Sequence, residues 1–194
     1  MAPFAKAFGA WQGTQDLHNR PFDCGFCGRY VSSNLGLNMV HGSTVIASAY
    51  VCPNCVGMNL FQGNDQYPSP AFGQSVGHVP AGLSELYEEA RRCTGESCFT
   101  AAVLICRKML MNIAVQEKAS PGLKFIEYVE YLSNKGFVPP NGKHWVDHIR
   151  KKGNEATHEI ALMTQTDAKD LLGFVEMLLR FIYEFPEMVP KPAQ

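Results

Sequence analysis

The sequence has almost no net charge and no long apolar run. Its 17 Lys and Arg residues nearly balance 18 Asp and Glu residues, which leaves a formal net charge of −1. A chain of this kind has no global attraction to nucleic acid or to an anionic membrane, so any such binding requires a local patch. The longest apolar run, AAVLIC at 101–106, ends at Arg107 and Lys108. That run is far short of the ~20 residues of a membrane span.

The N-terminal stretch also lacks the features of a secretory signal. MAPFAKAFGAWQG carries one lysine and no apolar central segment. We therefore expect a soluble, cytoplasmic protein without membrane contact. Hydrophobic residues make up 46% of the 194-residue chain, which is enough to form a core, so long disorder is not expected.

Seven cysteines stand out in a sequence of this kind. Four of them form two CxxC pairs, Cys24/Cys27 and Cys52/Cys55, and the others are Cys93, Cys98 and Cys106. An odd number in a cytoplasmic chain favours a metal site plus buried thiols over a disulfide framework.

The two CxxC pairs are the strongest chemical signal. A CxxC turn brings two thiolates to one side of a metal, and two such knuckles supply the tetrahedral sulfur set that zinc prefers. The intervening TVIASAYV, 44–51, is rich in β-branched residues and predicts a strand that enters the second knuckle. We expect one structural zinc per chain, held by Cys24, Cys27, Cys52 and Cys55. Two disulfides or a redox CxxC are the alternatives.

A zinc ribbon by itself does not define a function. Arg20 and Arg29 are the basic residues that flank the first knuckle. So few cations favour a structural or protein-docking role over DNA binding.

The amino-acid composition of the sequence changes near residue 80. Residues 1–80 are rich in Gly, Pro, Asn and Ser, and 62–80 is dense in residues that break helices. From Leu83 onward helix-forming residues dominate. We predict a zinc-ribbon module over 1–80 and a helical domain over 81–194, so the fold class is mainly α.

Four to five antiparallel helices are expected in the second part, because the connections are short. The first three are predicted over about 84–93, 97–118 and 122–134. The fourth begins near Gly142. The fifth begins near Thr166 and Asp167, as its N-cap, and ends before Pro186.

The helix over 97–118 has a clear apolar stripe at 100° per residue. Its members are Phe99, Val103, Cys106, Leu110, Ile113 and Ala114. Arg107 lies at the edge of that stripe, about 80° from Phe99. It is either a snorkelling arginine or a cation that lines a site.

The stretch RKKGNEATHEI, 150–160, spaces Arg150, Asn154 and His158 four residues apart. On one unbroken helix they form a polar line about 140–220° from Trp145, whereas Trp145, Ile149, Ala156 and Ile160 form the core stripe. The line then faces solvent, a ligand or a second subunit. Gly153 is the residue that would break such a helix.

Positive charge gathers around this line. Between 143 and 152 there are four cations, against one acid: Lys143, Arg150, Lys151, Lys152 and Asp147. This local excess of +3 can hold a phosphate even in a neutral protein.

Three blocks of sequence resemble the family known as domain of unknown function 4145. They are EEARRCTGESCFTAAVLICRKML, VDHIRKKGNEATHE and TDAKDLLGFVEMLLRFIYEFP, within about 85–186. A CxxC…CxxC ribbon ahead of the domain also looks like members of that family. The family in turn is similar to the HEPN superfamily of small helical domains, many of which are metal-independent ribonucleases of toxin or anti-phage systems.

The resemblance implies a HEPN-like antiparallel bundle that acts as a homodimer. Its hallmark is an Arg, a polar residue such as Asn, and a His after four to six intervening residues. Asn154 and His158 match, but seven residues separate Arg150 from His158, and Gly153 stands where the Arg is expected. Lys152, Arg150 or Arg107 would then supply the cation, with Lys151 nearby.

Two functions from different classes follow from these observations. One is a metal-independent endoribonuclease, with His158 moving the proton, Arg150 stabilising the phosphate charge and Asn154 orienting either group. The other is a non-catalytic module, acting as a sensor or adaptor, that binds a nucleotide, a nucleic acid or a protein, with a protein partner docked on the zinc ribbon.

Overall fold

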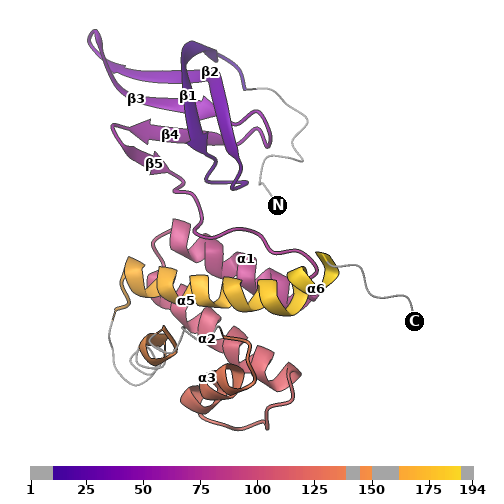
Figure 1. Cartoon of the computed structure of the whole chain (residues 1–194). Helices are drawn as coiled ribbons and strands as arrows, with labels where there is room; N and C mark the ends of the chain where they lie inside the picture. The colour runs from indigo at the N-terminus through magenta and orange to yellow at the C-terminus, as the bar shows by residue number, and fades with distance from the viewer. Residues whose placement is uncertain (1–10, 139–144, 150–161, 189–194) are drawn as a thin grey trace. The chain divides into compact units, whose positions relative to one another are not determined.

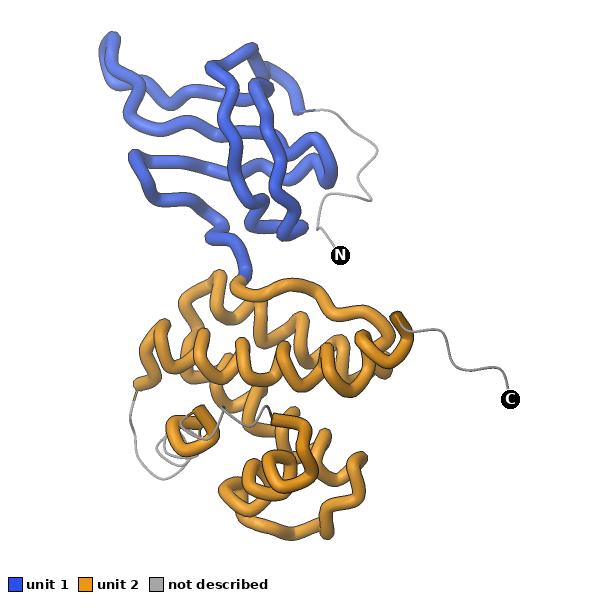
Figure 2. The backbone as a smooth tube through the Cα atoms, viewed as in Figure 1, with its two compact units in different colours: residues 1–71 blue, residues 72–194 orange. Residues whose placement is uncertain are grey.

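A computed structural model describes residues 11–138, 145–149 and 162–188 of the chain. The chain folds as two compact units, residues 1–71 and residues 72–194, coloured separately in Figure 2. Each unit has its own hydrophobic core and is described by itself.

The first unit is a five-stranded antiparallel sheet in which consecutive strands are neighbours (Figure 1). The predicted strand over 44–51 is confirmed as β3. The sheet is larger than a minimal ribbon, and its strands are β1 (Gln15–Asp23), β2 (Tyr30–His41), β3 (Thr44–Val51), β4 (Met58–Gln62) and β5 (Asp65–Tyr67).

Side-chain contacts connect β1 with β4 and β5, at the other end of the strand order. Gln66 on β5 donates from Nε2 to the Asp23 carbonyl on β1 at 2.7 Å. The Arg20 guanidinium lies 4.0 Å from the centroid of the Phe61 ring. The sheet is therefore curled rather than flat, since β1 and β5 are separated by three strands along its order.

A small aromatic core lies inside the curl. Phe22, Tyr50 and Phe61 are buried, and their ring centroids are 5.3–6.3 Å apart. Together with buried cysteines they form the hydrophobic cluster of this unit. A core of this size supplies limited stability by itself.

The second unit is helical, as predicted (Figure 1). Its elements are α1 (Ala81–Gly95), α2 (Phe99–Gln116), α3 (Phe125–Asn134), helical residues 145–149, α5 (Gln165–Leu179), the π-helical turn η2 (Arg180–Glu184) and α6 (Phe185–Met188). Helix α2 is central, because α1, α3 and α5 all pack against it.

The predicted stripe of α2 is confirmed. Val103, Cys106, Leu110, Ile113 and Ala114 are fully buried, and Phe99 packs at the margin of the core. Ala102 and Met109 widen the stripe because three other helices cover α2. Helix α2 is also long and apolar enough to cross a membrane by length and composition alone, a property that core helices of bundles share.

Helix α5 begins two residues earlier than predicted, and it ends at Leu179, before Pro186 as predicted. Its N-cap is Thr164, whose hydroxyl accepts from the Asp167 N–H, while the Asp167 carboxylate accepts from the Thr164 N–H. This reciprocal capping box decides the start. At the other end the helical path continues through η2 into α6, where Pro186 occupies the first turn. The π-helical turn η2 comes directly before this proline, whose ring would clash with the carbonyl four residues back in a regular α-helix.

Residues 72–80 run along the helices as a strap before α1 begins. Arg91 of α1 is buried and donates to the carbonyls of Phe72 and Gly73, at 3.1 and 2.7 Å, and to the Ser75 hydroxyl. A 2.7 Å ion pair with Glu88 balances its charge. Arg91 therefore holds three residues of the strap in place through hydrogen bonds.

The other side of the strap is held by acidic side chains of α5 and η2. Glu176 accepts from the Gln74 N–H at 3.1 Å, and Glu184 accepts from the Gly77 N–H at 3.0 Å. The Gly77 hydrogen bond and the neighbouring Arg180 guanidinium lower the pKa of Glu184. Arg180 bonds both carboxylates, so it links the two anchor points.

We expect Gly73→Ala to destabilise the helical unit more than Gly122→Ala. Both glycines have positive φ, 76° and 85°, which costs alanine about 1–2 kcal/mol. A Cβ at Gly73 would also meet Glu176 Oε2 at 2.6 Å and Tyr87 Oη at 3.1 Å, whereas no atom lies within 4 Å at Gly122. Thermal unfolding followed by helical circular dichroism measures the difference. Equal losses for the two variants would contradict the strap packing.

Candidate metal centre and motif helix

The two CxxC pairs form two turns with matching hydrogen bonds. In the first, the Cys24 N–H donates to the Arg29 carbonyl at 2.9 Å, and the Gly28 N–H donates to the Cys24 carbonyl at 2.8 Å. In the second, Cys52 and Val56 repeat this pattern with Gly57 in the place of Arg29, both at 2.9 Å. The turns lie at the ends of β1 and β3.

The residue after each second cysteine has a left-handed backbone. Gly28 has φ 68°, which glycine adopts readily, and Val56 has φ 62°. This conformation is unfavourable for a β-branched residue, and it persists only where the surroundings impose it. Two hydrogen bonds hold Val56 in this conformation: its N–H donates to the Cys52 carbonyl at 2.9 Å, and its carbonyl accepts from Trp11 Nε1 at 2.8 Å.

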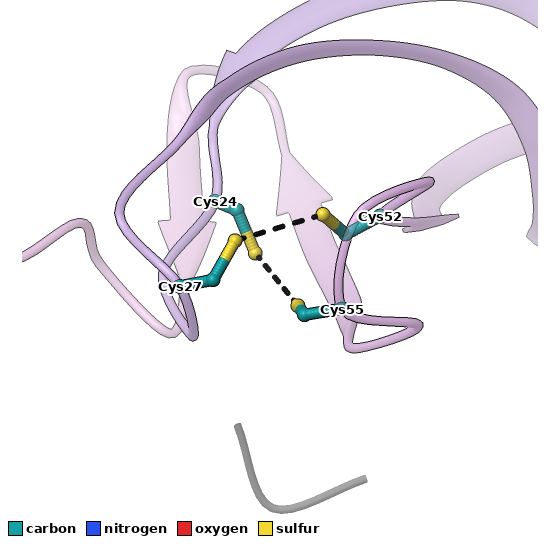
Figure 3. A group of neighbouring side chains, drawn as sticks. All are labelled: Cys24, Cys27, Cys52 and Cys55. Atoms are coloured by element: carbon teal, nitrogen blue, oxygen red, sulfur yellow. Dashed lines mark hydrogen bonds between the residues drawn. The ribbon is translucent and has the colours of Figure 1, made fainter. Parts of the chain in front are cut away.

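All four predicted sulfur atoms come together (Figure 3). Cys24 Sγ lies 3.6 Å from Cys55 Sγ, and Cys27 Sγ lies 3.9 Å from Cys52 Sγ. The four atoms lie within 4.8 Å of one another. A tetrahedron with metal–sulfur bonds of about 2.3 Å separates its sulfurs by about 3.8 Å. The cluster is compatible with a metal site such as zinc.

Asn59 joins the two turns, and sequence reasoning missed it. This side chain is fully buried on β4. Its Oδ1 accepts from the Gly25 N–H at 2.9 Å, and its Nδ2 donates to Cys24 Sγ at 3.4 Å and to the Gly57 carbonyl at 3.1 Å. One amide thus contacts both knuckles and one sulfur. Its place directly across the sheet from Tyr50 depends on the register of β3 and β4.

Burial makes the cluster unfavourable for thiolates that lack a cation. Burial raises the pKa of the Cys52 and Cys55 thiols, and the neighbouring Cys24 raises both further. At Cys27 burial also raises the pKa, but hydrogen bonds from the Arg29 backbone and the Asn54 side chain outweigh it and lower the pKa to about 7. A bound cation is what stabilises four thiolates at this spacing.

The remaining cysteines differ from one another in exposure. Cys106 is buried in the helical core, where burial raises the pKa of its thiol, and Cys93 is half-buried. Cys98 is exposed, so the prediction of a buried thiol is wrong there. It is the N-cap residue of α2, outside the apolar stripe.

The predicted residues Arg150, Lys151, Lys152, Asn154 and His158 lie outside the described residues. The segment that leads into them, 145–149, is helical and is anchored on α5. The Trp145 ring packs edge-on against Phe174 at 5.2 Å, and His148 Nε2 lies 2.9 Å from Asp170 Oδ2. Ile149 is fully buried, as the core stripe predicted.

The model of a protein family described as "domain of unknown function (DUF4145)" matches residues 88–192, which is more than half of the chain. The chain belongs to the DUF4145 family. No curated protein and no solved structure matches it. The matched region begins within α1 and continues past α6, so the DUF4145 domain contains the motif residues and excludes the four-cysteine cluster.

Among the cations predicted for the site, Arg107 lies within the described residues of the DUF4145 domain. Its guanidinium lies 4.3 Å from the centroid of the Phe125 ring, over α3. Partial burial lowers its pKa. Arg107 is therefore stacked on an aromatic ring at the α2–α3 contact, as a snorkelling arginine would be.

We expect Asn59→Ala to weaken metal binding by about 10- to 100-fold, the range typical of lost outer-shell contacts to a metal site. The substitution removes the N–H donor to Cys24 Sγ and the link between the two turns. Competition with a chromophoric chelator measures the affinity. Asn19→Ala is the control, because Asn19 is exposed and bonds the Ser32 hydroxyl instead. Equal affinities in Asn59→Ala and wild type would exclude the role assigned to Asn59.

Proposed function

We propose that this chain is a HEPN-like, metal-independent endoribonuclease whose N-terminal sheet is held together by one structural zinc. The family membership and the Arg150/Asn154/His158 spacing support the nuclease assignment. The sulfur cluster supports the zinc. A role in a toxin-type or anti-phage system is part of this proposal, as is a cytoplasmic location.

Zinc is the metal that best suits the cysteine centre. Four sulfur donors leave no position for water or substrate, which is the pattern of a structural site. Asn59 and the Phe26 N–H donate to Cys24 Sγ, and Asn54 donates to Cys27 Sγ, all at 3.4 Å. Such N–H donors reduce the negative charge of a tetrathiolate centre.

The proposed reaction is transfer within the RNA strand. The 2′-hydroxyl attacks the adjacent phosphorus and loses its proton to His158, and the bond from phosphorus to the 5′-oxygen breaks. Arg150 stabilises the charge on the phosphate, and Asn154 orients His158 or the phosphate. In a two-fold homodimer the second His158 donates a proton to the departing oxygen.

The observation that most strongly supports this proposal is the packing against α5 of helical residues 145–149, which come directly before the motif residues. Trp145 and Ile149 face the core as a continuous helix requires, and the His148–Asp170 contact ties the same turn to α5. This arrangement supports the helical interpretation on which the Arg150, Asn154 and His158 spacing depends. A polar line on that helix then points away from the core.

A non-catalytic module that binds a nucleotide, RNA or protein is the second candidate. The stacking of Arg107 on Phe125 favours it, because that cation is held at a helix contact. Residues 1–71 carry three cations (Lys6, Arg20, Arg29) and three acids (Asp16, Asp23, Asp65), a net charge of 3 − 3 = 0. The sheet therefore offers no general attraction to RNA.

We expect one zinc per chain in freshly purified protein. Strong chelation at neutral pH should unfold the sheet unit and leave the helical circular dichroism largely unchanged, because zinc supplies much of the folding energy of a module with a small core. Elemental analysis gives the stoichiometry, and Trp11 fluorescence in a Trp145→Phe background follows the sheet. Cys52→Ser should bind zinc poorly, and Cys98→Ser is the matched control. A metal-free wild type with an intact sheet would rule out the zinc proposal.

We expect wild-type protein to cleave single-stranded or transfer RNA in the presence of chelator, and His158→Ala to lose at least about 100-fold of that rate, since a general acid or base contributes 10²- to 10⁴-fold. Products are resolved on gels, and both proteins are purified identically to control for contaminating nuclease.

His18→Ala is the control, because His18 is an exposed histidine of β1 in the sheet unit. It should cleave as wild type does. Equal rates in wild type and His158→Ala would overturn the nuclease proposal. Saturable RNA or nucleotide binding without turnover would establish the second candidate.

A further inference from the structure

The middle of the sheet unit carries no formal charge over a long stretch. From Tyr30 to Asn64, 35 consecutive residues include no Asp, Glu, Lys or Arg. This stretch covers β2, β3 and β4. About a quarter of the residues in an ordinary domain are charged, so a surface of this size without charge is unusual.

The β2–β3 hairpin extends beyond its neighbours in the sheet. β1 pairs with β2 as far as Gly36, and β4 pairs with β3 only from Ser48 onward. β2 and β3 continue to pair with each other up to His41 and Thr44. Residues 37–47, here called the apolar ribbon, are therefore two-stranded, and in the described part of the chain no third strand pairs with them.

The apolar ribbon exposes large hydrophobic side chains on both strands. Met39 and Val40 on β2 are 61% and 59% exposed, and Val45 and Ile46 on β3 are 51% and 43% exposed. A two-stranded ribbon is marginally stable in water, and apolar edges without charge or proline favour pairing with another strand. Natural edge strands that stay unpaired usually carry lysine, proline or a bulge.

A bulge distinguishes the two edges of the apolar ribbon. Met39 pairs with Ala47 and Val40 pairs with Val45, so Ile46 is the extra residue on β3. A bulge bends its strand and disrupts regular pairing. The β3 edge is thus blunted, whereas β2 from Leu37 to His41 keeps a regular edge.

We propose that the β2 edge of the apolar ribbon, residues 37–41, pairs antiparallel with the same edge of a second copy of this chain. Around a two-fold axis a strand meets its own copy, so any charge on it would lie near a like charge. The apolar ribbon carries no charged side chain, so pairing with its own copy brings no like charges together. The two hairpins would form one four-stranded sheet, which converts two marginal ribbons into a stable unit.

The exposed side chains also favour strand pairing over simple face-to-face contact. Four of them cover far less than the about 800 Å² per partner of a standard interface. Backbone hydrogen bonds along the paired edges supply the remaining interaction. Tight RNA binding by the apolar ribbon is not expected, because phosphate contacts need cations that residues 30–64 do not have.

Sedimentation of the full-length, zinc-loaded protein over a concentration series tests this proposal. We expect wild type to self-associate and Val40→Lys to raise the dissociation constant of that step at least tenfold, because the two lysines would lie diagonally across the two-fold axis on one face of the paired strands. Asn34→Lys is the control. Asn34 is exposed on β2 as well, but it lies in the part that pairs with β1. It should associate as wild type does.

Hydrogen exchange on the same samples locates the interface. Amides of residues 37–41 should be slowed in associated wild type and fast in Val40→Lys, while one zinc per chain in both proteins shows that the sheet remains folded. A monomeric wild type, or unchanged association in both Val40→Lys and Met39→Lys, would overturn the proposal. The RNA assay with His158→Ala tests the nuclease proposal separately. Of these outcomes, a monomeric wild type would also contradict the two-fold arrangement of His158, whereas unchanged association in the lysine variants would leave the nuclease proposal as it stands.

Discussion

The contact of the buried Asn59 amide with both cysteine turns is the interaction on which the sheet unit depends. The amide accepts from Gly25 in the first turn, and it donates to Gly57 in the second and to the Cys24 sulfur. Close approaches surround it: a Cβ at Gly25 would lie 2.1 Å from the Pro68 carbonyl oxygen, and one at Gly57 would lie 2.5 Å from the Phe26 ring. Because the aromatic core is small, these contacts and the sulfur cluster hold the ends of β1 and β3 together.

The helical unit is built on a different constraint, the burial of one broad face of α2. Three helices cover α2, and the strap of residues 72–80 covers α1 and α5 through Arg91, Glu176 and Glu184. The strap belongs to the helical unit although its composition is that of a linker. Burial, and then the charge of Glu176, raise the pKa of Tyr87, whose hydroxyl donates to the Gln74 carbonyl beneath the strap.

The two units carry opposite chemical character. The sheet is uncharged over its three central strands and exposes an apolar ribbon, which suits protein contact. The helical unit contains the DUF4145 match and the local excess of positive charge between residues 143 and 152. The proposed self-association through the ribbon would place two helical units in one assembly without using the predicted residues Arg150, Asn154 and His158.

Short-range patterns in the sequence predicted much of this protein. The spacing of the CxxC pairs identified the four sulfur positions, the β-branched run identified β3, and the 3.6-residue period identified the buried stripe of α2, because each signal lies within a few residues. The sequence did not reveal Asn59, which lies 35 residues from Cys24, or the positive φ at Val56. The sequence also did not reveal that the helical path continues beyond α5 through the π-helical turn η2 into α6.

The sequence by itself determined the donor set, the helical period and the absence of charge between residues 30 and 64. Only the tertiary structure decided which residues from distant parts of the chain contact these features. The register of β3 and β4 places Asn59 between the knuckles, and the unequal lengths of the strands leave the apolar ribbon without neighbours. Such pairings join residues far apart in the chain, and no local pattern encodes them, because strand register and side-chain packing are set by the whole sheet at once.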